Sequence, residues 1–262
     1  MVLLEKQRNS VLRMVIVECY FFQGDFMNSY NKKMETLITP HINAMRKALE
    51  ISKLGVSSED IGPFVPYIFD EYESSKIKLM FVGQQTNGGP SIKDLIDQKI
   101  SYPELFEDWV EFKHNDASSK SHYNSPFWNF IHKVCKEIGI NKLGFVWSNI
   151  VKFESNNSCP RKEIYEIGRK FFNTMPLEIK AVEPDMVVFL TGPNYDWAIK
   201  DAFPEVFFST VRNLPIRQFS EVNNFPAKKC FRLHHPRYLR TYSENNDTLV
   251  RAIAENYNKW NT

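Results

Sequence analysis

The feature of this chain that most constrains its fold is a series of four short apolar runs, separated by longer segments in which apolar residues recur at helical spacing. The runs cover residues 76–82, 143–151, 186–190 and 229–233. The third is continuously apolar, as is typical of a parallel strand that is buried on both faces. Strands that alternate with helices predict right-handed crossovers and a mostly parallel sheet. We therefore expect an α/β fold, a three-layer α/β/α sandwich around a four-stranded, mostly parallel sheet.

Helix boundaries are predicted from capping residues. Thr39-Pro40 and Ser125-Pro126 each place an N-cap hydroxyl before a proline at the first helical position. The second of these helices is expected to end at Gly139. Further helices are expected over residues 105–112 and after Pro160, Gly192 and Ser243. Residues 206–210 and 216–219 fit either short strands or loops.

Length and composition suit one globular domain. The chain has 262 residues, of which 43% are hydrophobic, and we expect residues 34–262 to form a single domain. Residues 1–33 are expected to be an N-terminal tail. Part of this tail is expected to be non-native, because residues 18–24 resemble a degraded protease-tag site.

Charge and cysteine content exclude several classes of protein. The net charge is +2, so bulk charge selects no partner. The four cysteines include no C-x-x-C pair, which argues against a zinc or iron–sulfur site and favours free thiols in a reducing, cytoplasmic compartment. No run of about 18 apolar residues predicts a membrane span. We expect a monomer that needs neither a metal nor an organic cofactor.

Polar residues end, or directly follow, each of the four apolar runs. They are residues 83–87, 147–152, 191–192 and 234–239. In an open parallel sheet, ligands bind at the carboxyl ends of the strands, so these loops are expected to face one pocket. The chain has no G-x-x-x-x-G-K-[ST] loop, no G-x-G-x-x-G after the first run and no G-x-S-x-G turn. These absences argue against the common nucleotide-binding and serine-hydrolase sites.

With its polar motifs in this order, the chain resembles the uracil-DNA glycosylase superfamily. That family has an α/β/α fold around a four-stranded parallel sheet. Its first motif, G-Q-D-P-Y-H or a variant, follows the first strand, an asparagine ends the second strand, and H-P-S-P-L-S or a variant follows the fourth. The matching stretches here are Gly83-Gln84-Gln85-Thr86-Asn87, Asn149 and His235-Pro236-Arg237-Tyr238-Leu239. The resemblance covers residues 76–242.

The resemblance implies a role for each matching residue. Asn149 would read a flipped base, because a side-chain amide offers both a donor and an acceptor to a pyrimidine edge. His235 would hydrogen-bond the base oxygen on which negative charge develops. The adjacent His234 makes this assignment ambiguous, but the pairing of His235 with Pro236 favours His235. Leu239 would wedge into the base stack. Each residue also has a structural interpretation: a strand-end cap, a loop histidine and a packed leucine.

The first motif departs from the family pattern. Gly83 and Gln84 keep the family's residues and are placed at the substrate, but Gln85 stands where the most active members have aspartate. Glutamine can orient a water molecule but cannot accept its proton. Asn87 is a second amide that could position the water. The aromatic residue that the family stacks on the base is left open between Tyr102, Phe106 and Trp109.

The resemblance implies DNA, single- or double-stranded, as the partner. A basic run near the last motif has no acidic residue within it and is expected to contact DNA phosphates through Lys228, Lys229, Arg237 and Arg240. Such a run can also be a solvated face.

Three functions remain open at this point. The first is a DNA glycosylase that hydrolyses the N-glycosidic bond of a flipped uracil or related damaged base, as in base excision repair. The second is a catalytically weak or inactive module that recognises a base on the same fold, which the glutamine at position 85 favours. The third is a glycosidase of free nucleosides, which becomes the better interpretation if the basic run lies far from the pocket.

Overall fold

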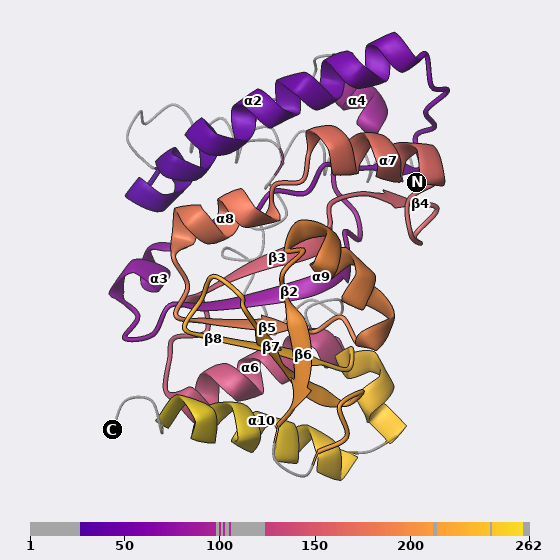
Figure 1. Cartoon of the computed structure of the whole chain (residues 1–262). Coiled ribbons are helices and arrows are strands. Elements are labelled where there is room, and N and C mark those ends of the chain that lie inside the picture. The colour runs from indigo at the N-terminus through magenta and orange to yellow at the C-terminus, as the bar shows by residue number, and fades with distance from the viewer. Residues whose placement is uncertain are drawn as a thin grey trace, which may run out of the picture.

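The computed structural model describes residues 27–97, 100, 102, 105, 124–211, 214–241 and 243–258, with the side chains of residues 239–241, 243–245 and 258 left out. A six-stranded sheet in the order β3-β2-β5-β8-β7-β6 lies at its centre (Figure 1). Neighbouring strands among β3, β2, β5 and β8 pair in parallel. They span Phe145–Val151, Leu79–Gln85, Met186–Phe189 and Lys229–Leu233.

The expected mostly parallel sheet is confirmed, but the expected count of four strands is wrong. β7 (Phe219–Asn223) and β6 (Phe207–Thr210) extend the sheet beyond β8 as antiparallel strands. Both fall within or next to the two segments that the sequence left undecided. Because an edge strand is covered on fewer sides, it needs no continuous apolar run, and Phe207 is 52% exposed.

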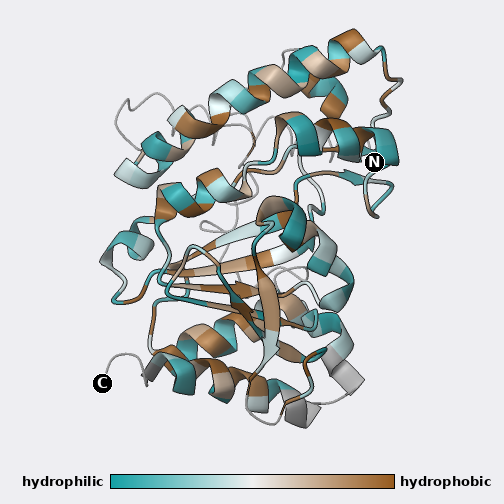
Figure 2. Ribbon diagram, viewed as in Figure 1, coloured by the Kyte–Doolittle hydropathy of each residue, from teal (hydrophilic) through white to brown (hydrophobic). Residues whose placement is uncertain are grey.

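Helices pack on both faces of this sheet (Figure 1). One face is covered by α2, α7 and α8, which span Ser29–Ser52, Lys162–Phe171 and Met175–Val182. The other is covered by α6 (Pro126–Ile138) and α10 (Ser243–Asn258). The central strands are largely apolar, whereas the helices carry both apolar and hydrophilic residues (Figure 2). The short helix α9 (Asp196–Ala202) follows β5.

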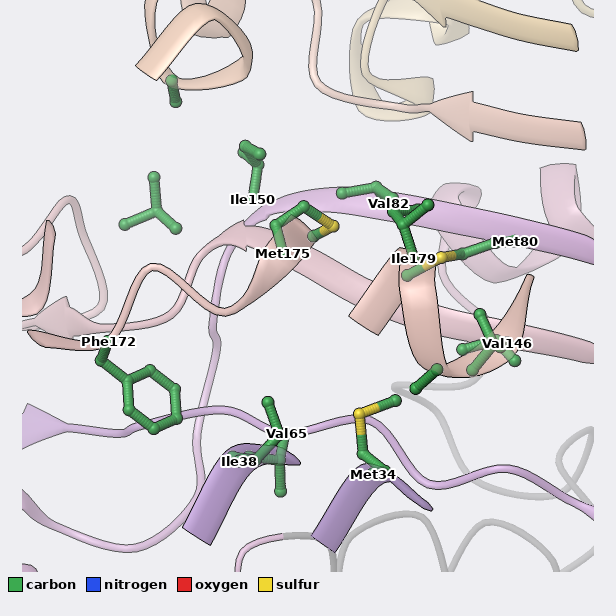
Figure 3. Close-up of a cluster of buried hydrophobic side chains, with 14 of the residues drawn as sticks. Met34, Ile38, Val65, Met80, Val82, Val146, Ile150, Phe172, Met175 and Ile179 are labelled. Carbon is green, nitrogen blue, oxygen red and sulfur yellow. The ribbon is translucent and has the colours of Figure 1, made fainter. Parts of the chain in front are cut away.

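The two faces of the strands form two hydrophobic clusters, as strand alternation requires. Met80 and Val82 of β2 pack with Ile179 of α8 and with Met34 and Ile38 of α2 (Figure 3). The intervening strand residues belong to the opposite cluster, which contains Leu79, Phe81, Ile131, Val134 and Ile253.

Helix α2 begins earlier than predicted. Asn28 is its N-cap and accepts a hydrogen bond from the Asn31 backbone N–H, so Thr39 is not a cap and Pro40 lies within the helix. Pro40 is exposed, and the buried residues Met34, Ile38, Ile42, Met45 and Leu49 continue the packed face on both sides of it. This packing offsets the hydrogen bond that proline removes. Residues 29–33, which were expected to belong to a tail, are therefore helical, whereas residues 1–26 lie outside the described part.

The cap of α6 follows the prediction. Ser125 Oγ accepts from the Trp128 N–H, Pro126 occupies the first turn, and Gly139 ends the helix with φ +78°. The remaining elements are short: β1 (Asp60–Ile61) pairs with β4 (Glu154–Ser155), and α3, α4, η2 and η3 span Asp70–Ser74, Ile92–Ile96, Pro193–Tyr195 and Pro236–Thr241. The helix expected over residues 105–112 falls almost wholly outside the described residues. Within the described ranges, no helix is long and apolar enough to cross a membrane.

Candidate functional site

The carboxyl ends of β2 and β3 meet at Gly83 and Asn149, which are partners in the parallel register. Asn149 is only 2% exposed, and its side-chain oxygen fills the space where a β-carbon on residue 83 would lie. Phe127 Cζ and Trp147 Nε1 are each 3.5 Å from the same point. A β-carbon at position 83 would therefore overlap the Asn149 side chain, whereas it would be in ordinary van der Waals contact with Phe127 and Trp147.

The amide nitrogen of Asn149 is buried and has no hydrogen-bond partner among the residues that the structure describes. Buried polar groups in proteins are nearly always paired, and an unmet donor costs about 1–3 kcal/mol. Such a group at the end of a parallel strand marks a place where a ligand can supply the missing acceptor. Asn149 is thus found where the sequence predicted a base-reading amide.

His235 joins this group through Phe127. The two rings stack with centroids 5.6 Å apart and planes 21° apart, and the Tyr238 ring meets the imidazole edge-on at 6.4 Å. The Arg237 backbone N–H donates to His235 Nδ1 over 3.1 Å. Because Nδ1 accepts this bond, the proton of the neutral ring is on Nε2.

The ring of His235 is held neutral by its surroundings. Burial, and to a smaller degree the charge of Arg237, lowers its pKa to about 4. At neutral pH His235 therefore offers one uncharged donor, Nε2–H. The adjacent His234 has a lowered pKa as well, but its Nδ1 lies near Gly192 instead, 3.7 Å from the point where a β-carbon would be. The stack on Phe127 selects His235 over His234, as the sequence favoured.

The two glutamines of the first motif make different contacts. Gln84 Nε2 donates to the Thr191 carbonyl over 2.7 Å and ties the ends of β2 and β5 together. Gln85 Oε1 accepts a hydrogen bond from Tyr195 Oη, which also lies 3.2 Å from Cys159 Sγ. Burial and then Cys159 raise the pKa of Tyr195, so its hydroxyl stays protonated. The oxygen of Gln85 is therefore occupied, and its NH₂ group is the part left to bind a ligand or water.

Asn87 lies on an exposed turn that is fixed by other residues. Thr86 Oγ1 donates to the Gly88 carbonyl over 3.1 Å, and the Gly88 N–H donates to Glu154 Oε1 over 2.8 Å. Gly88 and Gly89 have φ of +90° and +119°, which glycine adopts readily. Asn87 itself is exposed and takes no part in the packed group of Gly83, Asn149, Phe127 and His235.

Most of the predicted DNA-contacting run does not reach this site. Lys228 and Lys229 lie at the amino end of β8, the opposite edge of the sheet, and pair with Asp185 and Glu221 at 2.8 and 2.9 Å. Arg232, within the same run, is 2% exposed and paired with Asp196. A shared stretch of sequence does not mean a shared surface, because alternate strand residues point to opposite faces.

Only the last part of that run lies beside the site. Arg237 is exposed next to His235. Leu239 and Arg240 belong to η3, but their side chains lie outside the described residues, and the wedge and phosphate roles predicted for them stay predictions.

Of the three aromatic residues that the sequence left open, the structure describes only Tyr102. Tyr102 is 4% exposed and belongs to the hydrophobic cluster on the α2 side of the sheet, whereas Phe106 and Trp109 fall outside the described residues. The aromatic ring at the site is Phe127, in the first turn of α6. Its position directly after Ser125-Pro126, at the start of a helix, was the available signal. Nothing in the sequence pointed to Tyr195, which reaches Gln85 from 110 residues away.

The three described cysteines, Cys135, Cys159 and Cys230, are free thiols, as predicted. A scan against protein-family models and a search of curated proteins find no match to this chain. The group around Gly83 contains an unpaired buried amide, an aromatic ring and, stacked on that ring, a neutral imidazole donor. The hydrogen bond between Gln85 and Tyr195 lies at the end of the same strand, β2. These groups suit recognition of a flat, polar heterocycle.

Proposed function

We propose that this protein is a DNA glycosylase of the uracil-DNA glycosylase type, acting on uracil or a related damaged base. The observation that carries the proposal is that Asn149 and Phe127 both approach Gly83 and that His235 stacks on Phe127. We take the parallel strands β3, β2, β5 and β8 as the equivalent of the family's four-stranded sheet, with helices as outer layers and β6 and β7 as an addition.

In the proposed complex, the base reaches the site flipped out of the nucleic acid. The amide of Asn149 pairs with its N–H and carbonyl edge, which satisfies the buried Nδ2 group. The base stacks on the Phe127 ring, an arrangement worth ~1–3 kcal/mol per base. Gly83 leaves room for both contacts because it has no side chain.

His235 acts on the leaving base. As the N-glycosidic bond breaks, the bonding electrons move onto the base and negative charge develops on its O2 carbonyl oxygen. The neutral Nε2–H of His235 donates to that oxygen and strengthens the contact in the transition state. Removing one such donor costs about 100- to 1,000-fold in rate.

Gln85 limits the step in which water attacks the sugar. With Oε1 bound to Tyr195, its NH₂ group can hold a water oxygen but cannot take the water's proton. The water's proton would leave to solvent, so we expect slow hydrolysis compared with a site that has a carboxylate at this position. The same contact favours a second candidate function, recognition of a base without cleavage.

A base-release assay separates these candidates. The full chain is incubated with oligonucleotides that carry one uracil, as single strands and as U:G and U:A duplexes, and free uracil is measured by chromatography. We expect release by the wild type, its loss in Asn149→Ala and His235→Ala, and its retention in the control His234→Ala. Uracil-dependent binding without release would support recognition alone. The absence of both uracil release and uracil-dependent binding would refute both candidate functions.

Several properties accompany this proposal. We propose single- or double-stranded DNA as the partner, hydrolysis without a metal or organic cofactor, a monomeric protein and a reducing, cytoplasmic compartment. The free thiols support the last of these.

A further inference from the structure

A hollow in the molecule lies along α6. It is a groove of about 500 Å³ between α6 and the first turns of α10. Its polar lining consists of three asparagines, one histidine and two lysines: Asn124, Asn129, Asn246, His132, Lys133 and Lys136. Pro126 and Phe130 complete the lining, and none of the described residues in it carries a carboxylate. A groove of this composition suits an anionic, hydrogen-bonding ligand.

The groove begins beside the candidate site. Pro126 lines it, and the next residue, Phe127, stacks on His235. Helix η3, which follows His235, packs against both α6 and α10. The groove and the ring that stacks on His235 are therefore neighbours at the start of α6.

The lysines are arranged for contact with such a chain. Asn129, Lys133 and Lys136 are four and three residues apart, so they share one face of α6 along about 10 Å of its length. Both lysines are exposed. Lys133 pairs with Asp247 at 3.0 Å, but the two side chains are 56% and 62% exposed, and an ion pair this open exchanges readily for another anion.

We propose that this groove binds the phosphodiester backbone of the strand whose base enters the site, with Lys133 and Lys136 contacting successive phosphates. That the bound strand is DNA rests on the proposed function. It assigns to α6 the phosphate contacts that the sequence placed on Lys228 and Lys229. Those two lysines lie at the opposite end of the parallel strands and provide a matched control.

The test compares two double variants that remove the same charge. Binding of a fluorescent, uracil-containing single strand is followed by anisotropy from 50 to 200 mM salt for the full-length wild type, Lys133→Gln/Lys136→Gln and Lys228→Gln/Lys229→Gln. We expect the groove variant to bind at least tenfold more weakly at low salt. Its slope of log K against log salt should be shallower by about 1.4, as expected for two lost contacts to a single strand. The control variant should bind as the wild type does.

Two outcomes would overturn the groove assignment: wild-type binding by the groove variant, or an equal loss in both variants. Release of uracil from free deoxyuridine, measured in parallel, separates the groove from the chemistry. If the wild type releases uracil from DNA and the groove variant binds and releases equally well, the groove proposal fails and the glycosylase proposal stands. If no variant releases uracil but only the groove variant loses binding, the groove proposal stands and hydrolysis fails.

Discussion

The side-chain oxygen of Asn149 occupies the space in which a β-carbon on Gly83 would lie. The two residues are register partners on adjacent parallel strands, so a close approach between them is fixed by the sheet itself. A glycine at this point of β2 is unfavourable for the strand but leaves the amide room to lie across it. The strand end is therefore shaped for the side chain of its neighbour.

Replacement of Gly83 by alanine should move Asn149 and remove base recognition. We expect uracil release or uracil binding to fall at least tenfold, with a loss of about 1–3 kcal/mol in unfolding free energy from overpacking. Gly55→Ala is the control, since a β-carbon there meets no atom within 4 Å. Denaturant unfolding and base-release assays on both variants check this, and unchanged activity in Gly83→Ala would contradict the placement of Asn149.

The lowered pKa of His235 predicts a pH dependence of stability. The folded pKa is about 4, whereas an exposed histidine has a pKa near 6.5. Between these values the unfolded chain binds more protons, so His235 contributes stability above pH 6.5 that is lost as the pH falls to 4. We expect roughly 2 kcal/mol, allowing for partial screening by solvent.

This contribution is measured by urea unfolding of the wild type and of His235→Gln at pH 7 and pH 4.5. The wild type should lose more stability than the variant over this interval. An NMR titration of the imidazole that returned a pKa near 6.5 would show that the ring is solvated and would remove the basis for a neutral donor.

A carboxylate at position 85 should accelerate base release. Gln85→Glu preserves the acceptor for Tyr195 Oη and adds a group that can take a proton from water. We expect the single-turnover rate to rise at least tenfold and to gain an acidic limb in its pH profile. In the double variant Gln85→Glu/Tyr195→Phe the faster release should persist, and the acidic limb of the pH profile should move to a different pH. An unchanged rate in Gln85→Glu would place the attacking water elsewhere.

A buried ion pair next to the site should be important for folding. Lys152 Nζ lies 2.6 Å from Glu178 Oε1 and donates to Ser148 Oγ over 2.6 Å, and the two charged side chains are 4% and 0% exposed. Burial lowers the pKa of Lys152, and Glu178 partly opposes this. Lys152→Met should cost about 3–5 kcal/mol because it leaves a buried carboxylate unpaired.

The double variant Lys152→Met/Glu178→Leu tests the reason for that loss. If the unpaired charge is responsible, the double variant should regain most of the stability, as measured by thermal and urea unfolding. Equal or greater destabilisation in the double variant would show that the pair contributes through its own attraction and its bonds to Ser148 and Thr174.

The parallel part of the fold was predictable because each central strand is buried on both faces. β8 has the predicted bounds, and β3 and β5 differ from the predicted runs by a few residues at their ends. β6 and β7 were left undecided between strand and loop because both carry mixed residues, and β6 is also an edge strand. The start of α2 was misplaced because Thr39-Pro40 imitates a cap, whereas tertiary packing carries the helix through the proline.

The sequence could place Asn149 near the end of β3 and His235 just after β8, because both positions are read directly from the apolar runs. The roles given to the two residues stay predictions. Phe127 comes from a helix and Tyr195 from a 3₁₀ turn. Local sequence patterns do not indicate where such elements lie relative to the strands. Lys228 and Lys229 were misassigned because a strand separates them from the site by its whole length.

The most direct test of the account is the single-turnover release of uracil from a single-stranded oligonucleotide by the wild type, Asn149→Ala and Gly55→Ala. We expect slow release by the wild type, the same rate for Gly55→Ala and a rate at least 100-fold lower for Asn149→Ala. Release by Asn149→Ala at the wild-type rate would contradict the central claim that this buried amide reads the base.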